Sequence, residues 1–398
     1  MMMKHKGKGG EKAKGKGKGQ EMVRKSVSQW PICCGCIEKI LVGRYSRTRA
    51  HLLNLLQGYG PPFAHKVALW GDLPYRGESI DVFDPEDEYG PVYKQLSDTM
   101  NAYGPVFSIH SGDVKSGGGS CGELNYKRWE DIMDSFNHPA FISLGDNDWT
   151  DCHRLSNGNY DPLERLDYLR HRFYEDGHTI YGTGSFEYNM FNKYYPEMHW
   201  WVYGGIMYVN AHIIGSNNGL YDGVDRSCDQ FLSMIDPNCA MSNAEANART
   251  AVVNELVSAA FGIAKDEGLA GVMVAIQANI FGGPCLAWPD CDVSHPVVIT
   301  NGFTDFWENL VHETLMFGKP VVLFHGDSHY YQVFENPDNR AENLVAVQNP
   351  GSASIGWVAC DVDPDTDKVF HFSHVDVTPP ERRGLEQEDT EDSMAYEL

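Results

Sequence analysis

Short apolar runs alternate with longer amphipathic stretches from residue 66 onward, and this alternation restricts the possible folds more than any other feature. Apolar runs of this length are typical of buried strands, and the amphipathic stretches are long enough for helices. Strands and helices in this order form βαβ units around a largely parallel sheet, so the sequence predicts an α/β domain. The apolar runs lie at residues 66–72, 105–113, 140–148, 205–215, 271–280 and 320–329, and the helical patterns at residues 126–136, 161–174, 243–268 and 304–318.

The order of segments predicts one large domain rather than several. The chain shows no internal repeat, and no linker-like segment interrupts residues 60–378. Asn243 is the predicted N-cap of the third helix, and Gly268 and Gly318 are predicted helix stops. Residues 354–377 have the pattern of two strands around an Asp/Pro turn, which predicts an antiparallel hairpin at the end of the domain.

The composition is that of a globular protein with enough apolar residues for a core. Of the 398 residues, 42% are hydrophobic and 22% are charged, which does not suit a fully disordered chain. No stretch approaches the roughly 18 consecutive apolar residues of a transmembrane helix, so we expect none. The net charge of −23 argues against a general nucleic-acid binder, and we expect no sequence-specific nucleic-acid partner.

Both ends of the sequence are predicted to be disordered tails around a domain at residues 59–377. Residues 1–58 form a basic, Lys/Gly-rich arm with a short helix; its first 25 residues hold nine of the 32 Lys and Arg but only two of the 55 acids. This arm has no apolar face to bury, so it is either a solvated tail or, through residues 1–36, a peripheral contact with anionic lipid or with RNA. Residues 378–398 form an acidic tail.

The ten cysteines are too few for a disulfide scaffold of this length. Cys33, Cys34 and Cys36 lack the second Cys/His pair of an ordinary zinc site, and beside the basic arm they could accept palmitoyl groups. No secretory signal is convincing, because Glu38 and Lys39 interrupt the apolar stretch. Several other cysteines could pair in an oxidising compartment: Cys121/Cys152, Cys228/Cys239 and Cys285/Cys291. These observations oppose each other, so the localisation stays open, with an intracellular site slightly favoured.

Four of the predicted strands end in Gly followed by Asp: Gly71-Asp72, Gly112-Asp113, Gly145-Asp146 and Gly326-Asp327. Ligands of open α/β sheets bind beyond the carboxyl ends of the strands, and Gly permits a sharp turn there. Gly-Asp is common in ordinary turns, but turns alone do not require the same acid four times. Four neighbouring carboxylates would repel one another unless a cation held them. The sequence therefore predicts a cation-binding cleft.

In order and spacing, these motifs resemble the calcineurin-like metallophosphoesterases, which include purple acid phosphatases and phosphodiesterases. The resemblance covers about residues 66–335 and depends on GDLPY, SGDVKSG, GDNDWTDCHR, IQANIF and HGDSHY. It implies a four-layer α/β/β/α sandwich with metals at one sheet edge. It also implies metal-dependent hydrolysis of phosphoric monoesters or diesters, with a small phosphorylated substrate.

The same resemblance implies a ligand set that departs from the family pattern. Pro74 stands where the family has a metal-binding His, Asp148 where it has its catalytic His, and Gln277 where it has a lone His. Asp113 would bridge two divalent metals. The implied metal ligands are Asp72, Asp113, Asn147, Gln277, Asp327 and His329.

Oxygen ligands dominate this set, which favours Mn²⁺ or Mg²⁺ over Zn²⁺, with Fe and Ca²⁺ as further candidates. His110, His212 and His325 fall in strand patterns, where a core histidine is the default, although His110 and His325 stand close enough to their Asp to reach the cleft.

The proposed chemistry needs positive charge and a proton donor near the phosphoryl group. Lys115, directly beyond Asp113, is the predicted phosphate contact, and Asp148 or His153 is the predicted general acid. The glycines at 117–119 either bring backbone N–H groups to the anion or form a flexible loop. A disulfide between Cys121 and Cys152 would buttress this cleft.

Aromatic residues near the motifs have two interpretations. They either pack in the core, as is usual, or line a pocket for a nucleobase or sugar. The residues are Trp149, Trp200, Trp201, Tyr330 and Tyr331.

Two alternatives to an enzyme remain from the sequence. Because several His positions of the family are lost, the chain could be a non-catalytic relative that only binds metal or phosphate. It could also be a membrane-tethered adaptor whose main functional elements are the basic arm and its cysteines.

Overall fold

Two mixed β-sheets form the centre of the domain in this computed structural model, which describes residues 60–174, 180–220, 238–281, 301–352 and 354–379. The predicted arm at 1–58, its cysteine cluster and all but two residues of the predicted tail at 378–398 lie outside the described residues. The expected pairs Cys228/Cys239 and Cys285/Cys291 also depend on side chains outside them.

The first sheet has six strands in the order β13-β12-β1-β2-β3-β4. Its three central strands are parallel, as the alternating pattern predicts. β12 and β4 flank them and run antiparallel to them, and β13 pairs antiparallel with β12. The last two strands form the predicted C-terminal hairpin. The strands are β1 (His65–Trp70), β2 (Phe107–His110), β3 (Pro139–Ile142), β4 (Tyr181–Gly182), β12 (Gly356–Val362) and β13 (Phe370–Asp376).

The second sheet has seven strands in the order β10-β11-β9-β8-β7-β6-β5. Its four middle strands are parallel. β10 and β6 flank them and run antiparallel to their neighbours, and β5 pairs antiparallel with β6 at the edge of the sheet. The strands are β5 (Asn189–Asn192), β6 (Tyr195–Tyr203), β7 (Ile206–Asn210), β8 (Gly271–Ala275), β9 (Val321–His325), β10 (Gln332–Glu335) and β11 (Leu344–Gln348).

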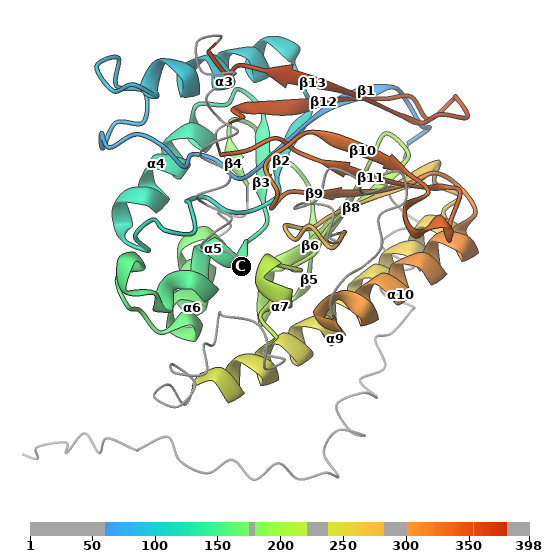
Figure 1. The fold of residues 1–398 in the computed structure, drawn as a ribbon. Coiled ribbons are helices and arrows are strands. Elements are labelled where there is room, and N and C mark those ends of the chain that lie inside the picture. Colours follow the sequence, from blue (N-terminus) through green and yellow to red (C-terminus); the bar gives the residue numbers. More distant parts are fainter. Residues whose placement is uncertain (1–59, 175–179, 221–237, 282–300, 353, 380–398) are drawn as a thin grey trace, which may run out of the picture. The chain divides into compact units, whose positions relative to one another are not determined.

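Helices cover the outer faces of both sheets. Figure 1 shows α3 (Gly90–Tyr103), α4 (Glu123–Asp134) and α6 (Pro162–Tyr174) on one side and α9 (Asn238–Asp266) and α10 (Asn301–Phe317) on the other. The remaining short elements are α5 (Asp146–Trp149), α7 (Gly215–Asn218), η1 (Thr150–His153), η2 (Leu155–Asn157) and η6 (Pro337–Asn339).

Three apolar clusters separate these layers. Because successive side chains of a strand point to opposite faces, Val67 and Leu69 of β1 pack between the sheets, whereas Ala68 and Trp70 face the helices. A third cluster joins the outer face of the second sheet to α9 and α10. The arrangement is the expected four-layer α/β/β/α sandwich.

Most predicted helices and helix stops are present. Gly268 and Gly318 each have φ of 69°, the left-handed conformation of a helix C-cap. The predicted N-cap at Asn243 is wrong, because α9 already begins at Asn238. The predicted helices do not include α3, although Val92, Leu96 and Met100 repeat every fourth residue and Gly104 closes the helix in the left-handed conformation.

In the part of the chain that the structure describes, no helix combines the length and the apolar character needed to cross a bilayer.

Candidate metal centre

The four Gly-Asp turns follow the carboxyl ends of β1, β2, β3 and β9. Asp72, Asp113 and Asp327 have φ of 54°, 60° and 80°, a left-handed conformation that Asp tolerates better than most residues. Glycine is required where the turns meet, since a Cβ on Gly145 would lie 1.9 Å from Oδ1 of Asp113. Such backbone conformations gather at functional sites.

Three of these aspartates form a carboxylate cluster, which consists of Asp113, Asp146 and Asp327. Each offers a carboxylate oxygen, and the three oxygens lie within 4.8 Å of one another. Asp113 and Asp146 are buried and Asp327 is partly exposed. Three acidic oxygens at this spacing fit the hard oxygen-ligand site of a divalent cation such as Mg²⁺, Mn²⁺ or Ca²⁺.

Asp146 is the member of the carboxylate cluster that the implied ligand set omitted. Its Oδ2 accepts a hydrogen bond from Oγ of Ser216, at 2.6 Å. Its Oδ1 is buried and has no hydrogen-bond partner among the described residues. Leaving a buried polar oxygen unpaired is costly, so this atom indicates a missing ligand. The signal was present in the sequence as the third Gly-Asp pair.

Asp113 lies at the centre of a buried hydrogen-bond network. Its Oδ2 accepts hydrogen bonds from Oη of Tyr75 at 3.0 Å, Nδ2 of Asn147 at 2.9 Å and Nε2 of Gln277 at 3.1 Å. Burial raises the pKa of Asp113 well above its usual range, and the negative charge of Asp146 adds to this effect. A cation beside Asp113 would restore its charged form.

Asn147 and Gln277, both predicted metal ligands, lie against Asp113 through their amide nitrogens. The Gln277 side chain is fully buried, and its Oε1 already accepts the backbone N–H of Gly215 at 2.6 Å. Nδ2 of Asn147 also donates to Oη of Tyr75, at 2.9 Å. Both amides therefore orient Asp113, and their roles as ligands stay predictions.

Asp72, another predicted ligand, is separate from the carboxylate cluster. Its two oxygens accept the backbone N–H of Asp327 at 3.1 and 3.2 Å, and its Oδ2 accepts Nδ2 of Asn349 at 2.8 Å. Nε2 of the predicted ligand His329 lies 3.7 Å from Asp72 Oδ1. Burial raises the pKa of Asp72 to about 8, although the Asn349 hydrogen bond opposes this shift. Burial also lowers the pKa of His329 to about 4.

Two residues that the sequence analysis missed complete the site. Asn349 follows β11, and its Oδ1 accepts a hydrogen bond from Oγ of Ser111 at 2.9 Å, which fixes the amide toward Asp72. Tyr75 belongs to the GDLPY motif, and its ring packs edge-on against His329 with 5.2 Å between ring centres. The position of Tyr75, three residues after Asp72, was the available signal.

Asp148, a predicted general acid, lies beneath the site and fastens its loops. Its oxygens accept the backbone N–H groups of Asp113 at 3.1 Å, Gly145 at 2.8 Å and Val114 at 2.8 Å. Burial raises the pKa of Asp148 to about 6, while these hydrogen bonds and the charge of Lys115 act in the opposite direction. The structure thus gives Asp148 a positioning task, and its acid role stays a prediction.

The other two predicted catalytic residues make contacts with backbone carbonyls. Lys115 is almost fully buried and donates from Nζ to the carbonyl of Ser116 at 3.1 Å; burial lowers its pKa. Nδ1 of His153 lies 2.6 Å from the carbonyl of Thr150. These contacts test neither the predicted phosphate contact of Lys115 nor the predicted acid role of His153, and both roles stay predictions.

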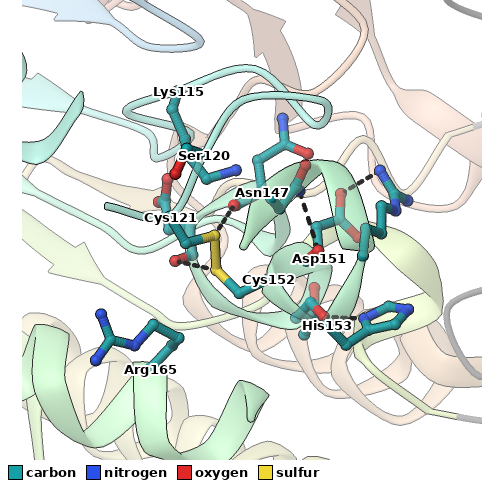
Figure 2. The surroundings of a disulfide bond; sticks show 12 residues. Lys115, Ser120, Cys121, Asn147, Asp151, Cys152, His153 and Arg165 are labelled. Atoms are coloured by element: carbon teal, nitrogen blue, oxygen red, sulfur yellow. Dashed lines mark hydrogen bonds and ion pairs between the residues drawn. A yellow bond between two sulfur atoms is a disulfide. The ribbon is translucent and has the colours of Figure 1, made fainter. Parts of the chain in front are cut away.

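The predicted disulfide between Cys121 and Cys152 is present, with 5.7 Å between the Cα atoms. Figure 2 shows it between the loop after Lys115 and the segment that carries Asp151 and His153. The carbonyl of Gly117 also accepts hydrogen bonds from Arg154 Nη1 at 3.0 Å and Asn157 Nδ2 at 2.7 Å. The glycine-rich loop is therefore held at both ends.

The histidines in strand patterns lie in the core, as is usual for a histidine in a buried strand. His110 uses both ring nitrogens, one with the carbonyl of Leu73 and one with the N–H of Gly112, each at 3.1 Å. Nδ1 of His212 lies 2.9 Å from Glu197 Oε1. His325 is buried against the ring of Phe281.

The aromatic residues near the motifs divide between the core and the surface. Trp149 and Trp201 are buried, which agrees with the core interpretation, whereas Tyr330 is 37% exposed.

No family model and no curated protein sequence matches this chain. Solved structures that are similar to it include two phosphatases. A dimetal phosphatase from Danio rerio shares 9% identity over 80% of this chain and 99% of its own, with a TM-score of 0.40. A purple acid phosphatase from yellow lupin (Lupinus luteus) seeds shares 10% identity over 81% of this chain and 55% of its own, with a TM-score of 0.41. At this low similarity, activity has to be argued from the residues of this chain.

Proposed function

We propose that this chain hydrolyses phosphoric esters with a divalent cation held by the carboxylate cluster of Asp113, Asp146 and Asp327. The observation that supports this most is the cluster itself, whose oxygens lie within 4.8 Å of one another while Oδ1 of Asp146 lacks a partner among the described residues. The resemblance of the strand-end motifs to the calcineurin-like phosphoesterases gives the reaction class.

The chemistry divides between the cation and the side chains around it. A bound divalent cation supplies a Lewis acid for the phosphoryl oxygen and lowers the pKa of water. Oxygen-only ligands favour Mn²⁺ or Mg²⁺. The hydroxyl of Tyr75 and the amide nitrogen of Asn147 both donate hydrogen bonds to Asp113, so they would hold this carboxylate in place beside the cation. Asp148 holds the two loops of the site through three backbone N–H groups.

The second candidate is a protein that binds metal or phosphate without turnover. The observation that favours it is the engagement of all three predicted catalytic side chains. Asp148 accepts three backbone N–H groups, Lys115 donates to Ser116, and His153 contacts Thr150. Under this hypothesis the cation is retained, but none of these three side chains is available to assist the leaving oxygen.

The deciding experiment measures hydrolysis of an aryl phosphate monoester and its diester by the full-length protein. The protein is stripped with a chelator and resupplied separately with Mn²⁺, Mg²⁺, Ca²⁺ and Zn²⁺. The proposal expects activity to return with Mn²⁺ or Mg²⁺ and to be absent in Asp113→Asn. Asp98→Asn, at an exposed carboxylate on α3, is the matched control and should remain active. Folded protein that binds Mn²⁺ without hydrolysing either ester would support the binding protein.

A further inference from the structure

The two sides of Asp113 differ in what they offer a cation. A two-metal site needs a bridging carboxylate with ligands on both sides, because its metals lie about 3.5–4 Å apart. We infer that the candidate metal centre takes one divalent cation, at Asp113, Asp146 and Asp327, and that hydrogen bonds of the protein close the second position beside Asp72. This inference rests on the proposed function, since both require a cation at the carboxylate cluster.

The side of Asp146 has the properties of a metal site. Three carboxylate oxygens from the ends of β2, β3 and β9 converge within 4.8 Å. Asp146 is 7% exposed, and its Oδ1 has no hydrogen-bond partner among the described residues. An acidic cluster by itself is common, but a buried oxygen that lacks a donor indicates a ligand.

The side of Asp72 is instead filled by the protein. Both Asp72 oxygens accept the N–H of Asp327, and Oδ2 also accepts Nδ2 of Asn349. The orientation of this amide is fixed, because Oδ1 of Asn349 accepts the hydroxyl of Ser111. Neutral N–H donors thus contact both Asp72 oxygens and take up part of the acceptor capacity that a metal would need.

Backbone also packs directly against Asp72. A Cβ on Gly326 would lie 2.4 Å from Asp72 Oδ2, and a Cβ on Gly351 would lie 2.3 Å from the Asp72 Cβ. Two stretches of chain therefore enclose this side chain. Within the described residues, Asp72 and His329 are not part of any group of three His, Cys, Asp or Glu ligands that converge within 4.8 Å.

The test is the number of Mn²⁺ ions that chelator-stripped, full-length protein binds. Isothermal titration gives the stoichiometry, and electron paramagnetic resonance distinguishes an isolated Mn²⁺ from an exchange-coupled pair. We expect one Mn²⁺ per chain with the spectrum of an isolated ion. Asp146→Asn should weaken Mn²⁺ binding by at least about tenfold, whereas Asp72→Asn should still bind one Mn²⁺ per chain.

Circular dichroism checks the fold of both variants, and Asp98→Asn is the surface control. If Asp72→Asn does not fold, the wild-type stoichiometry and spectrum decide alone. Two Mn²⁺ per chain with an exchange-coupled spectrum would overturn this inference and leave the proposed function intact. Folded wild-type protein that binds no Mn²⁺ would overturn both.

Discussion

Asp72 and Asp146 belong to the same Gly-Asp motif, yet their carboxylates differ in the hydrogen bonds that they accept. Each comes after a glycine at the end of a parallel strand of the same sheet. Asp72 accepts hydrogen bonds from Asp327 and Asn349. Oδ2 of Asp146 accepts the hydroxyl of Ser216, and its Oδ1 is buried without a hydrogen-bond partner among the described residues. The motif places a carboxylate at the sheet edge, and residues from distant strands decide whether it is available to a cation.

The largest expected difference between the two aspartates is in catalysis. Asp146→Asn removes a ligand, so kcat/KM for an aryl phosphate should fall by about a thousandfold. In Asp72→Asn, kcat/KM should fall by less than about tenfold, because this substitution changes a residue outside the carboxylate cluster. Steady-state kinetics with saturating Mn²⁺ measures both values. Equal losses in the two folded variants would remove the distinction between the two sides.

The disulfide fastens the loops on the Asp146 side. Cys121 and Cys152 are separated by 31 residues, and loss of a crosslink of this size should lower the free energy of unfolding by about 3 kcal/mol. Urea denaturation of the Cys121→Ser/Cys152→Ser double variant measures the change, with reduced wild-type protein as the comparison. Unfolding curves identical to that of the oxidised wild type would show that the loops are held by other contacts.

Asn349 fastens the Asp72 side. Asn349→Ala would leave Asp72 Oδ2 without its amide donor and the Ser111 hydroxyl without its acceptor, so the free energy of unfolding should fall by about 2 kcal/mol. Asn189→Ala, on the exposed part of β5, should change it by less than about 0.5 kcal/mol. An Asn349→Ala variant as stable as this control would show that the Asp72 side needs no such donor.

A further expected effect is in the pH dependence of stability without metal. Burial raises the pKa of Asp72 from its usual 3.8 to about 8, so the folded state binds a proton that the unfolded state releases. Asp72 therefore stabilises the fold below about pH 4, and this contribution is lost as the pH rises to about 8. Asp113 and Asp148 shift in the same direction.

Chemical denaturation of chelator-stripped protein at several pH values between 4 and 8 tests this expectation. The stability of the wild type minus that of Asp72→Asn should fall as the pH rises, because only the wild type carries the Asp72 carboxyl. Buried histidines such as His329, whose pKa is lowered, act in the opposite direction but are present in both proteins. A difference that increases over this pH range would contradict the assignment of Asp72 as a buried, protonated carboxyl.

The layers and the place of the site could be predicted from the sequence, because both depend on local patterns. Apolar runs and amphipathic stretches indicated the strands and helices, and the repeated Gly-Asp pairs indicated which ends would carry carboxylates. Cys121 and Cys152 could be paired because each follows a motif loop of neighbouring strands. These signals each lie within a few residues of the feature they predict.

The use of each carboxylate could not be predicted in the same way. Asn349, whose side-chain amide donates a hydrogen bond to Asp72, lies 277 residues away in sequence, and no local pattern connects the two. The implied ligand set took Asn147 and omitted its neighbour Asp146, because the choice depends on how the turn after β3 directs successive side chains. Likewise, only the folded structure shows that Asp148 faces the backbone of its own loops.

Anomalous diffraction from crystals of the full-length protein grown with Mn²⁺ would locate the cation directly. We predict a single anomalous peak in contact with the carboxylates of Asp113, Asp146 and Asp327, and none beside Asp72. A peak between Asp72 and His329, or no peak at all in a folded protein at saturating Mn²⁺, would contradict the metal centre proposed for this chain.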